Sequence, residues 1–262
     1  MGFAFALMGL ALALFLATIA MIEVGHRAYF RREAAHLEPG GSAEAGLLAV
    51  EGAIFTLLGL MLAFTFSGAA ERFTVRKQLV AQEANDIGTA WLRIELLPAV
   101  ERPVLQAMVR EYVDARIDSY RLEIDDPRTA AARERAAGLQ DAIWLAAVEA
   151  CPRASAATAC SLLLGSVNDM INTTTTRRVA TWIHPPAPVY AMLLGLVLSA
   201  GLLTGYGMAP SHERNWLHRV LFAAGITVAV YVTLDMEYPR LGLIRMDAVD
   251  QLLVDVRRGL DR

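Results

Sequence analysis

The chain has 262 residues, of which 55% are hydrophobic and 19% charged, and its mean hydropathy is +0.40. This composition excludes an ordinary soluble domain and is typical of a membrane protein. The net charge of -3 shows no basic excess, which argues against a nucleic-acid partner.

The first predicted element is a transmembrane helix over residues 3–24. A bilayer core of about 30 Å needs about 20 apolar residues in a helix. This run supplies them and carries a charge only at Glu23. A signal peptide is the alternative, but no basic residue precedes the run and no small-x-small cleavage site follows it. A Pro-Gly-Gly turn at residues 39–41 then indicates a short loop.

The second predicted transmembrane helix spans residues 45–70 and is apolar except for Glu51. Ionisable groups at membrane depth are costly, so Glu51 is a candidate functional residue. A position so near the end of the span also allows its side chain to reach the interface. Glycines recur along this span, and we expect them to permit close contact between helices. They are Gly46, Gly52, Gly59 and Gly68.

Residues 71–184 are predicted to form an extramembrane domain of amphipathic helices. Its first helix should continue directly from the second span, because apolar residues recur at spacings near 3.5. These residues are Phe73, Val80, Ala84, Ile87, Trp91 and Ile94. A second helix presents one face made of Leu105, Val109, Tyr112, Arg116, Ile117 and Tyr120. Two more helices, over 129–150 and 155–180, would complete an antiparallel four-helix bundle.

Two further membrane helices are predicted over residues 186–207 and 216–234, followed by a C-terminal tail over 237–262. The domains are therefore the first two spans within 1–70, the helical domain 71–184, the last two spans within 185–236, and the tail. The expected fold class is an all-α integral membrane protein with four transmembrane helices and a helical bundle between the second and third.

Two carboxylates, Asp235 and Glu237, mark the end of the fourth span, where Pro239 and Gly242 break the helix. Basic residues, including Arg245, follow them. Ion pairing that holds this turn is the favoured interpretation, although a carboxylate pair with free carbonyl groups could also hold calcium.

The side of the membrane on which the helical domain lies stays open. Arg27, Arg31, Arg32 and Arg214 lie in the short loops on one side, and a larger number of basic residues flank the spans on the other. Long domains, however, translocate largely regardless of charge. Cys151 and Cys160 could form a disulfide if the domain is exported, or remain buried thiols in the cytoplasm.

Motifs of catalysis and cofactor binding are missing from the sequence. It contains no P-loop, no dinucleotide-binding glycine pattern, no His-Glu-x-x-His and no nucleophile elbow. Its five histidines fall at loops and span ends, without the spacing of a metal site. The sequence therefore predicts no enzyme, no cofactor and no metal.

Two segments resemble known families. FTLLGLMLAF at residues 55–64, followed by AERF at residues 70–73 and then by Arg76, Lys77, Asn85 and Asp86, resembles the second membrane helix and following segment of bacterial bestrophins. More closely, the whole chain resembles the bestrophin-like family of unknown function, in which an Asp-x-x-x-Pro-x-x-Gly-x-Ile-Arg segment follows the last span. The matching tail residues here are Asp235, Pro239, Gly242, Ile244 and Arg245.

The resemblance implies a pore, because bestrophins are pentameric anion channels whose second helix lines a hydrophobic neck. The positions carried over are Phe55, Leu58, Leu62 and Phe66, which share one face of the helix. The same residues could also face lipid or the helix-bundle core. No acidic calcium-clasp run is present, so gating by calcium is not implied.

The preferred hypothesis is a homo-oligomer, as a pentamer if it follows bestrophins, that conducts small inorganic anions such as chloride across the inner membrane of a bacterium. The alternative is a non-conducting, membrane-anchored scaffold or sensor whose helical domain binds a protein partner. A closed ring with the second helix at its axis would distinguish the channel from the scaffold.

Overall fold

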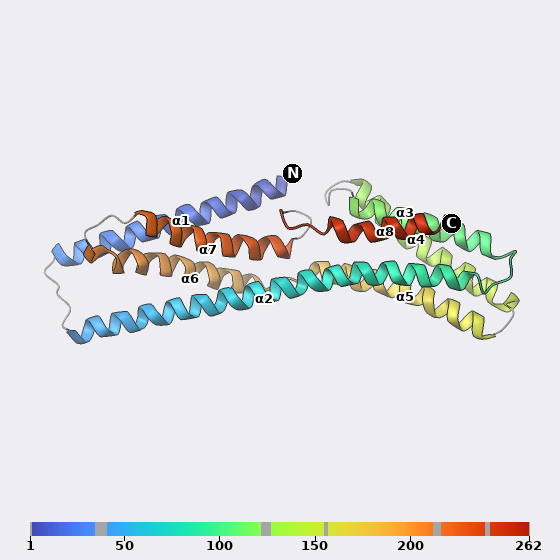
Figure 1. The fold of residues 1–262 in the computed structure, drawn as a ribbon, viewed down its shortest axis with the longest axis horizontal. Coiled ribbons are helices and arrows are strands. Elements are labelled where there is room, and N and C mark those ends of the chain that lie inside the picture. Colours follow the sequence, from blue (N-terminus) through green and yellow to red (C-terminus); the bar gives the residue numbers. More distant parts are fainter. Residues whose placement is uncertain are drawn as a thin grey trace. The chain divides into compact units, whose positions relative to one another are not determined.

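The computed structural model of the chain describes residues 2–34, 41–121, 127–154, 157–211, 216–238 and 242–261. Over these residues the chain forms eight α-helices and no β-strand, which confirms the all-α prediction (Figure 1). Two short 3-10 helices lie at Cys151–Arg153 and Ala209–Ser211. The α-helices are α1 (Gly2–Ala34), α2 (Gly41–Ile94), α3 (Arg102–Arg121), α4 (Pro127–Ala150), α5 (Ala157–Trp182), α6 (Ala187–Gly207), α7 (Trp216–Glu237) and α8 (Asp247–Gly259).

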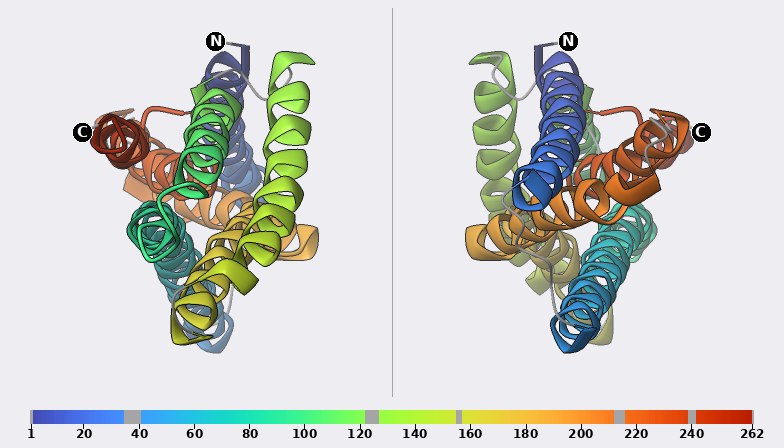
Figure 2. Two further views of the ribbon diagram at one scale, coloured as in Figure 1. Left: turned by 90° about the vertical axis from the view of Figure 1, so that its right-hand side faces the viewer. Right: turned by 90° about the vertical axis from the view of Figure 1, so that its left-hand side faces the viewer.

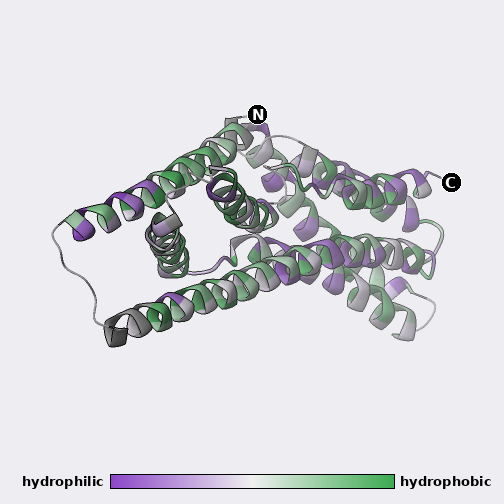
Figure 3. Ribbon diagram, turned by 60° about the vertical axis from the view of Figure 1, so that its left-hand side comes forward, coloured by the Kyte–Doolittle hydropathy of each residue, from purple (hydrophilic) through white to green (hydrophobic). Residues whose placement is uncertain are grey.

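Four helical stretches are long and apolar enough to cross a membrane, as predicted. They lie within Phe5–Ala34, Leu48–Ile94, Ala157–Gly207 and Trp216–Glu237. Hydrophobic residues accordingly dominate α1, α6, α7 and the first half of α2, whereas hydrophilic residues are frequent in the second half of α2 and in α3 to α5 (Figure 3). The second span also continues without a break, because α2 is a single helix of 54 residues.

The chain divides into two compact units. The first, which we call the membrane unit, contains residues 1–73 and 184–245. The second, the helical unit, contains residues 74–183 and 246–262. The boundary inside α2 falls between Phe73 and Thr74, close to the point where the sequence changes from apolar to amphipathic.

The membrane unit is held together by a close contact between α1 and α6, which run next to each other with α7 in the views of Figure 2. A Cβ atom built on Gly25 would lie 1.9 Å from the carbonyl oxygen of Leu202. One built on Gly205 would lie 1.8 Å from the carbonyl oxygen of Ile22. Both backbones therefore touch at positions where only glycine fits, which is the usual way for membrane helices to gain packing contacts.

The glycines of α2 make no comparable contact within the described residues. A Cβ on Gly46, Gly52 or Gly59 would meet nothing within 4 Å, and one on Gly68 would meet only the side chain of Arg72. In the ranges that the structure describes, therefore, the close approach of two membrane helices is made by α1 and α6.

The helical unit has a large apolar core, and both predicted faces contribute to it. On α2, Val80, Ile87 and Ile94 are buried, and on α3 the buried residues include Leu105 and Val109. The core also receives side chains from α4, α5 and α8. The bundle thus has a fifth helix that was not predicted, since α8 lies in the segment treated as a tail. Leu253 of α8 is 1% exposed.

A buried network of charges joins helices of the helical unit. Glu83 on α2 is fully buried and accepts hydrogen bonds from Arg116 on α3 and from Arg177 on α5. Arg177 also pairs with Asp250 on α8 at 3.4 Å. Breaking such a buried pair leaves an uncompensated charge, so these contacts favour one arrangement of α2, α3, α5 and α8.

Tyr112 lies beside this network and is fully buried. Its hydroxyl makes a hydrogen bond of 2.9 Å with Thr174 and accepts another from Gln140 at 3.2 Å. Burial, and then the negative charge of Glu83, raise the pKa of the Tyr112 phenol above its ordinary value of 10.0. The phenol is therefore held in its neutral form.

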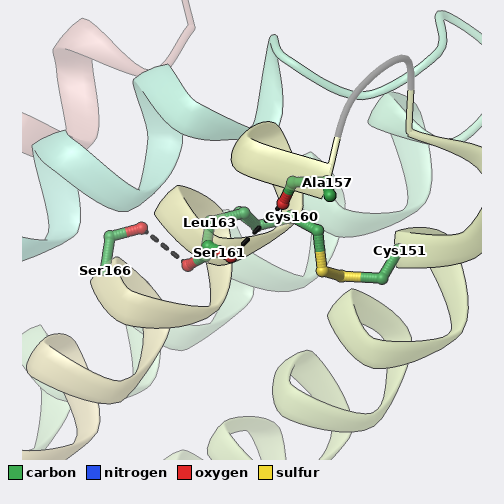
Figure 4. The surroundings of a disulfide bond; sticks show 6 residues. All are labelled: Cys151, Ala157, Cys160, Ser161, Leu163 and Ser166. Atoms are coloured by element: carbon green, nitrogen blue, oxygen red, sulfur yellow. Dashed lines mark hydrogen bonds between the residues drawn. A yellow bond between two sulfur atoms is a disulfide. The ribbon is translucent and has the colours of Figure 1, made fainter.

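The two cysteines of the chain, Cys151 and Cys160, are joined by a disulfide (Figure 4). Cys151 begins the 3-10 helix after α4, and Cys160 lies in the first turn of α5. Their Cα atoms are 5.1 Å apart, and both residues are partly exposed. The disulfide therefore closes the connection between two helices of the helical unit.

Candidate functional site

Three of the four pore candidates on α2 pack against helices of their own membrane unit. Leu58 is 3% exposed and belongs to the core of this unit, together with residues of α1, α6 and α7. Phe55 and Leu62 are partly buried against the same core, and the Phe55 ring meets Phe222 of α7 edge to face at 6.1 Å. Phe66, in contrast, is 45% exposed.

The opposite side of α2 is open along the whole membrane span. Leu57 is 46% exposed, Leu60 is 49% exposed and Phe64 is 66% exposed. Because a helix turns by about 100° per residue, these three side chains fall within about 60° of one another. They form an apolar stripe, which we call the open face of α2, that the described part of the chain does not cover.

Glu51, the predicted ionisable residue of the membrane, lies near the beginning of α2 and is partly exposed. Its carboxylate is next to Gly207, the last residue of α6, since a Cβ built there would lie 3.2 Å from Glu51 Oε1. Glu51 therefore lies at the end of a neighbouring membrane helix and not in the middle of the span.

Asp235 of the tail motif holds the chain that follows α7. Its carboxylate is fully buried. It accepts hydrogen bonds from the backbone amide of Leu243 at 3.0 Å and from that of Ile244 at 2.7 Å. A Cβ built on Gly242 would lie 1.2 Å from Asp235 Oδ1, so only glycine can occupy that position. We call Asp235 and residues 242–244 the tail clasp.

The clasp gives a physical reason for part of the tail pattern. The aspartate supplies the acceptor, and the glycine leaves room for it beside the two amides. Asp235 accepts these hydrogen bonds from backbone amides, and the expected ion pairing with the arginines of the tail stays a prediction. Pro239 and Arg240 lie outside the described residues, and Arg245 is exposed.

Glu237, the second predicted carboxylate, makes an ion pair with Arg72 and lies beside His184 within the membrane unit. It is 1% exposed and accepts a hydrogen bond from Nε of Arg72 on α2 at 2.8 Å. Nδ1 of His184, which precedes α6, lies 3.3 Å from its other oxygen. The His184 ring stacks on Tyr238 with 4.8 Å between centroids. Glu237 thus joins the ends of three membrane segments.

The sequence did not single out His184 or Arg72 as partners of Glu237, because they are 53 and 165 residues away from it along the chain. No periodicity relates such positions. Nor did it distinguish the two sides of α2, since both are apolar. In the described ranges, no group of three or more His, Cys, Asp or Glu side chains gathers as a metal ligand set.

Comparison with known proteins identifies the family. The model of the bestrophin-like domain matches residues 48–248. A search of curated proteins finds no match.

Solved structures have the same fold. Two mutated forms of a bacterial bestrophin homolog from Klebsiella pneumoniae are similar to this chain at 13% identity. The first has a TM-score of 0.72 and the alignment covers 95% of this chain and 97% of that one. The second has a TM-score of 0.70, with 96% and 99% covered. The crystal structure of a membrane protein has a TM-score of 0.73 at 13% identity, with 95% and 97% covered.

Sequence identity of 13% to solved structures shows the fold alone. Membership of a family is shown instead by the match to the family model. It matches most of the chain, including α2 from residue 48 onward, the last two membrane helices and the tail clasp. The chain therefore belongs to the bestrophin-like family.

Proposed function

We propose that this protein is a homo-oligomeric channel for small inorganic anions such as chloride, in the inner (cytoplasmic) membrane of a bacterium, and that α2 lines its path. The proposal involves no enzymatic step. Family membership supports it, and so does the observation that carries it: the apolar stretch of α2 is the least covered of the four. Only 11% of its most apolar window is buried, against 22 to 28% in the other three.

A pore needs several copies. One α2 provides a single apolar wall, and a closed ring of copies would bring several such walls around one axis. Five copies are what the resemblance to bestrophins implies. Apolar side chains at such a constriction would control conduction through its width and its wetting.

We assign the path to the open face of α2, with Leu57, Leu60 and Phe64. Leu58 is enclosed by its own subunit, so the face predicted from the sequence has less room for ions than the opposite one. Phe64 and Phe66 are two positions apart and point in directions about 200° apart, so both cannot face one axis. The two phenylalanines therefore distinguish the two faces.

The test is ion flux from liposomes that contain the purified protein, with chloride and potassium gradients measured separately and empty liposomes as a control. We expect chloride flux without potassium flux. Potassium-selective flux would refute the anion assignment. No flux with either ion from correctly inserted protein would refute the channel and favour the membrane-anchored scaffold.

Three alanine variants locate the path. Phe64→Ala should raise chloride flux several-fold, because it widens an apolar constriction. Phe66→Ala should leave flux close to that of the unmodified protein. Phe5→Ala is the matched control, since Phe5 lies on α1 and is 69% exposed, similar to the 66% of Phe64. A change in flux for Phe66→Ala alone would return the path to the face predicted from the sequence.

A further inference from the structure

The membrane unit contains a cavity of about 430 Å³ between α1, α6 and α7. Its described lining comes from residues 6–14, 190–194 and 227–238. Leucine is the most frequent lining residue, and Leu7 and Leu193 are buried in the deeper wall. The cavity therefore offers a mainly aliphatic surface, which has the chemistry of the bilayer interior.

The close contact between α1 and α6 explains where this cavity lies. The two backbones touch through Gly25 and Gly205, and a Cβ built on Gly201 would lie 3.2 Å from the carbonyl oxygen of Thr18. The cavity lies closer to the start of both helices than these contacts. Two helices that cross at an angle separate with distance from their point of contact. The cavity is therefore the wedge that α1 and α6 leave between them, with the end of α7 as its third wall.

The wedge opens toward the surroundings of the membrane unit. Leu10 and Leu194 line it, yet they are 51% and 40% exposed. Both residues belong to helical stretches that are long and apolar enough to cross a membrane, so hydrocarbon surrounds this opening. An apolar chain can therefore enter the cavity directly from the bilayer.

The depth and volume of the cavity suit one lipid chain. From Thr227 to Tyr238 the chain of α7 rises by about 16 Å at 1.5 Å per residue, and one leaflet is about half of the ~30 Å hydrocarbon core. An apolar cavity of about 150 Å³ holds a benzene molecule, so this one has room for roughly three times as many carbon atoms. That is about the content of one acyl chain.

Polar groups mark one end of the cavity. Tyr238 lines it, and the Tyr238 ring stacks on His184 with 4.8 Å between centroids. His184 lies beside Glu237, which pairs with Arg72, and the side chains of His184 and Arg72 are partly exposed. Tyrosines prefer the headgroup level of a membrane, where one part of the ring is in apolar surroundings and the hydroxyl is wet. An apolar body with one polar end is the division found in an amphiphile.

We propose that this cavity binds one acyl chain of a membrane phospholipid, whose ester and phosphate groups lie at the level of Tyr238 and His184. The chain completes the packing of α1, α6 and α7 where their own side chains do not meet, since protein interiors leave few voids larger than a water molecule. The described lining includes no residue of α2. The site is therefore separate from the proposed ion path, and it does not depend on whether the protein conducts ions.

A matched pair of variants on α1 tests the site. Ala11 lines the cavity, so Ala11→Phe would fill part of it with a ring. Ala13→Phe is the control, because Ala13 is exposed and points about 200° away from Ala11. We expect native mass spectrometry in a mild detergent to show one phospholipid retained per subunit in the unmodified protein and in Ala13→Phe, and its loss in Ala11→Phe. Retention in both variants, or no retained phospholipid in the unmodified protein, would overturn the proposal.

The unmodified protein provides a second test that requires no variant to fold. It is reconstituted in liposomes of phosphatidylethanolamine and phosphatidylglycerol that contain a trace of phosphatidylglycerol with a photoreactive diazirine in the middle of one acyl chain. We expect crosslinks to concentrate on the lining residues and to exceed those on Leu221 of α7, which is 60% exposed and lies outside the described lining.

Two results of this crosslinking would refute the site. Labelling in proportion to exposure would reduce it to the ordinary contact of a membrane helix with lipid. A cavity that stays unlabelled would show that a second copy of the chain covers it.

Discussion

The tail clasp allows a quantitative prediction. Replacement of Gly242 by alanine would place a methyl group 1.2 Å from Asp235 Oδ1, far inside any contact distance, so the carboxylate must move away. The amides of Leu243 and Ile244 then lose their acceptor. A hydrogen bond to a charged group contributes about 1.5 to 3 kcal/mol, so the two amides together give about 3 to 6 kcal/mol.

Thermal unfolding in detergent measures the effect. For a chain of this size, 1 kcal/mol shifts Tm by about 2 to 4 °C, so Gly242→Ala should lower Tm by at least about 6 °C. Gly225→Ala on α7 is the control, because a Cβ at Gly225 would meet nothing within 4 Å. Its effect should stay within about 1 kcal/mol and should be stabilising, since alanine is the better helix former.

A double-mutant cycle tests the reasoning itself. Asp235→Ala removes the oxygen with which the new methyl group would clash, so Gly242→Ala should cost little in that background. The two changes should therefore be strongly non-additive, with a coupling well above the ~0.5 kcal/mol seen for independent sites. An equal cost of Gly242→Ala in both backgrounds would refute the clasp.

Two further predictions concern the helix contact of the membrane unit and the core of the helical unit. Gly205→Ala should prevent α6 from approaching the Ile22 carbonyl and should lower Tm by several degrees. Gly195→Ala on the same helix should not lower Tm, because a Cβ built on Gly195 would meet nothing within 4 Å. Equal shifts in Tm for the two variants would contradict the contact. Because the pKa of Tyr112 is raised by burial and by Glu83, the folded protein retains a proton that the unfolded chain releases above pH 10. The stability of the folded protein should therefore fall as pH rises above that value, and it should fall less in the Tyr112→Phe variant. Thermal unfolding between about pH 9 and 11 measures both. Identical pH profiles for the variant and the unmodified protein would refute a raised pKa.

The membrane helices could be predicted because their cause is local. Hydrocarbon requires a continuous apolar run of sufficient length, and this requirement is visible in the sequence without knowledge of any partner. The continuation of α2 into the helical unit was also predictable from a local signal, because the heptad-like pattern of apolar residues begins where the apolar run ends. The tail pattern could also be recognised, although its mechanism could not.

Helix α8 is an intermediate case. Apolar residues recur at helical spacing at Val249, Leu253 and Val256 of this helix and at Leu260 directly after it, so the sequence contained a signal that a helix is present. What it could not indicate is that Leu253 and Leu260 join a core formed by residues 84–170, which lie more than eighty positions earlier.

By itself, the sequence determined the number of membrane spans, the all-α class, the helical bundle between the second and third spans, and the family resemblance. Only the tertiary structure decided which side of α2 is open, which glycines touch a neighbouring backbone, that Asp235 binds two amides, and that Cys151 and Cys160 are joined. The physical reason is that a helix follows from interactions between residues at most four positions apart. A buried carboxylate, a backbone contact or a disulfide depends on residues that only folding brings within a few ångströms of each other.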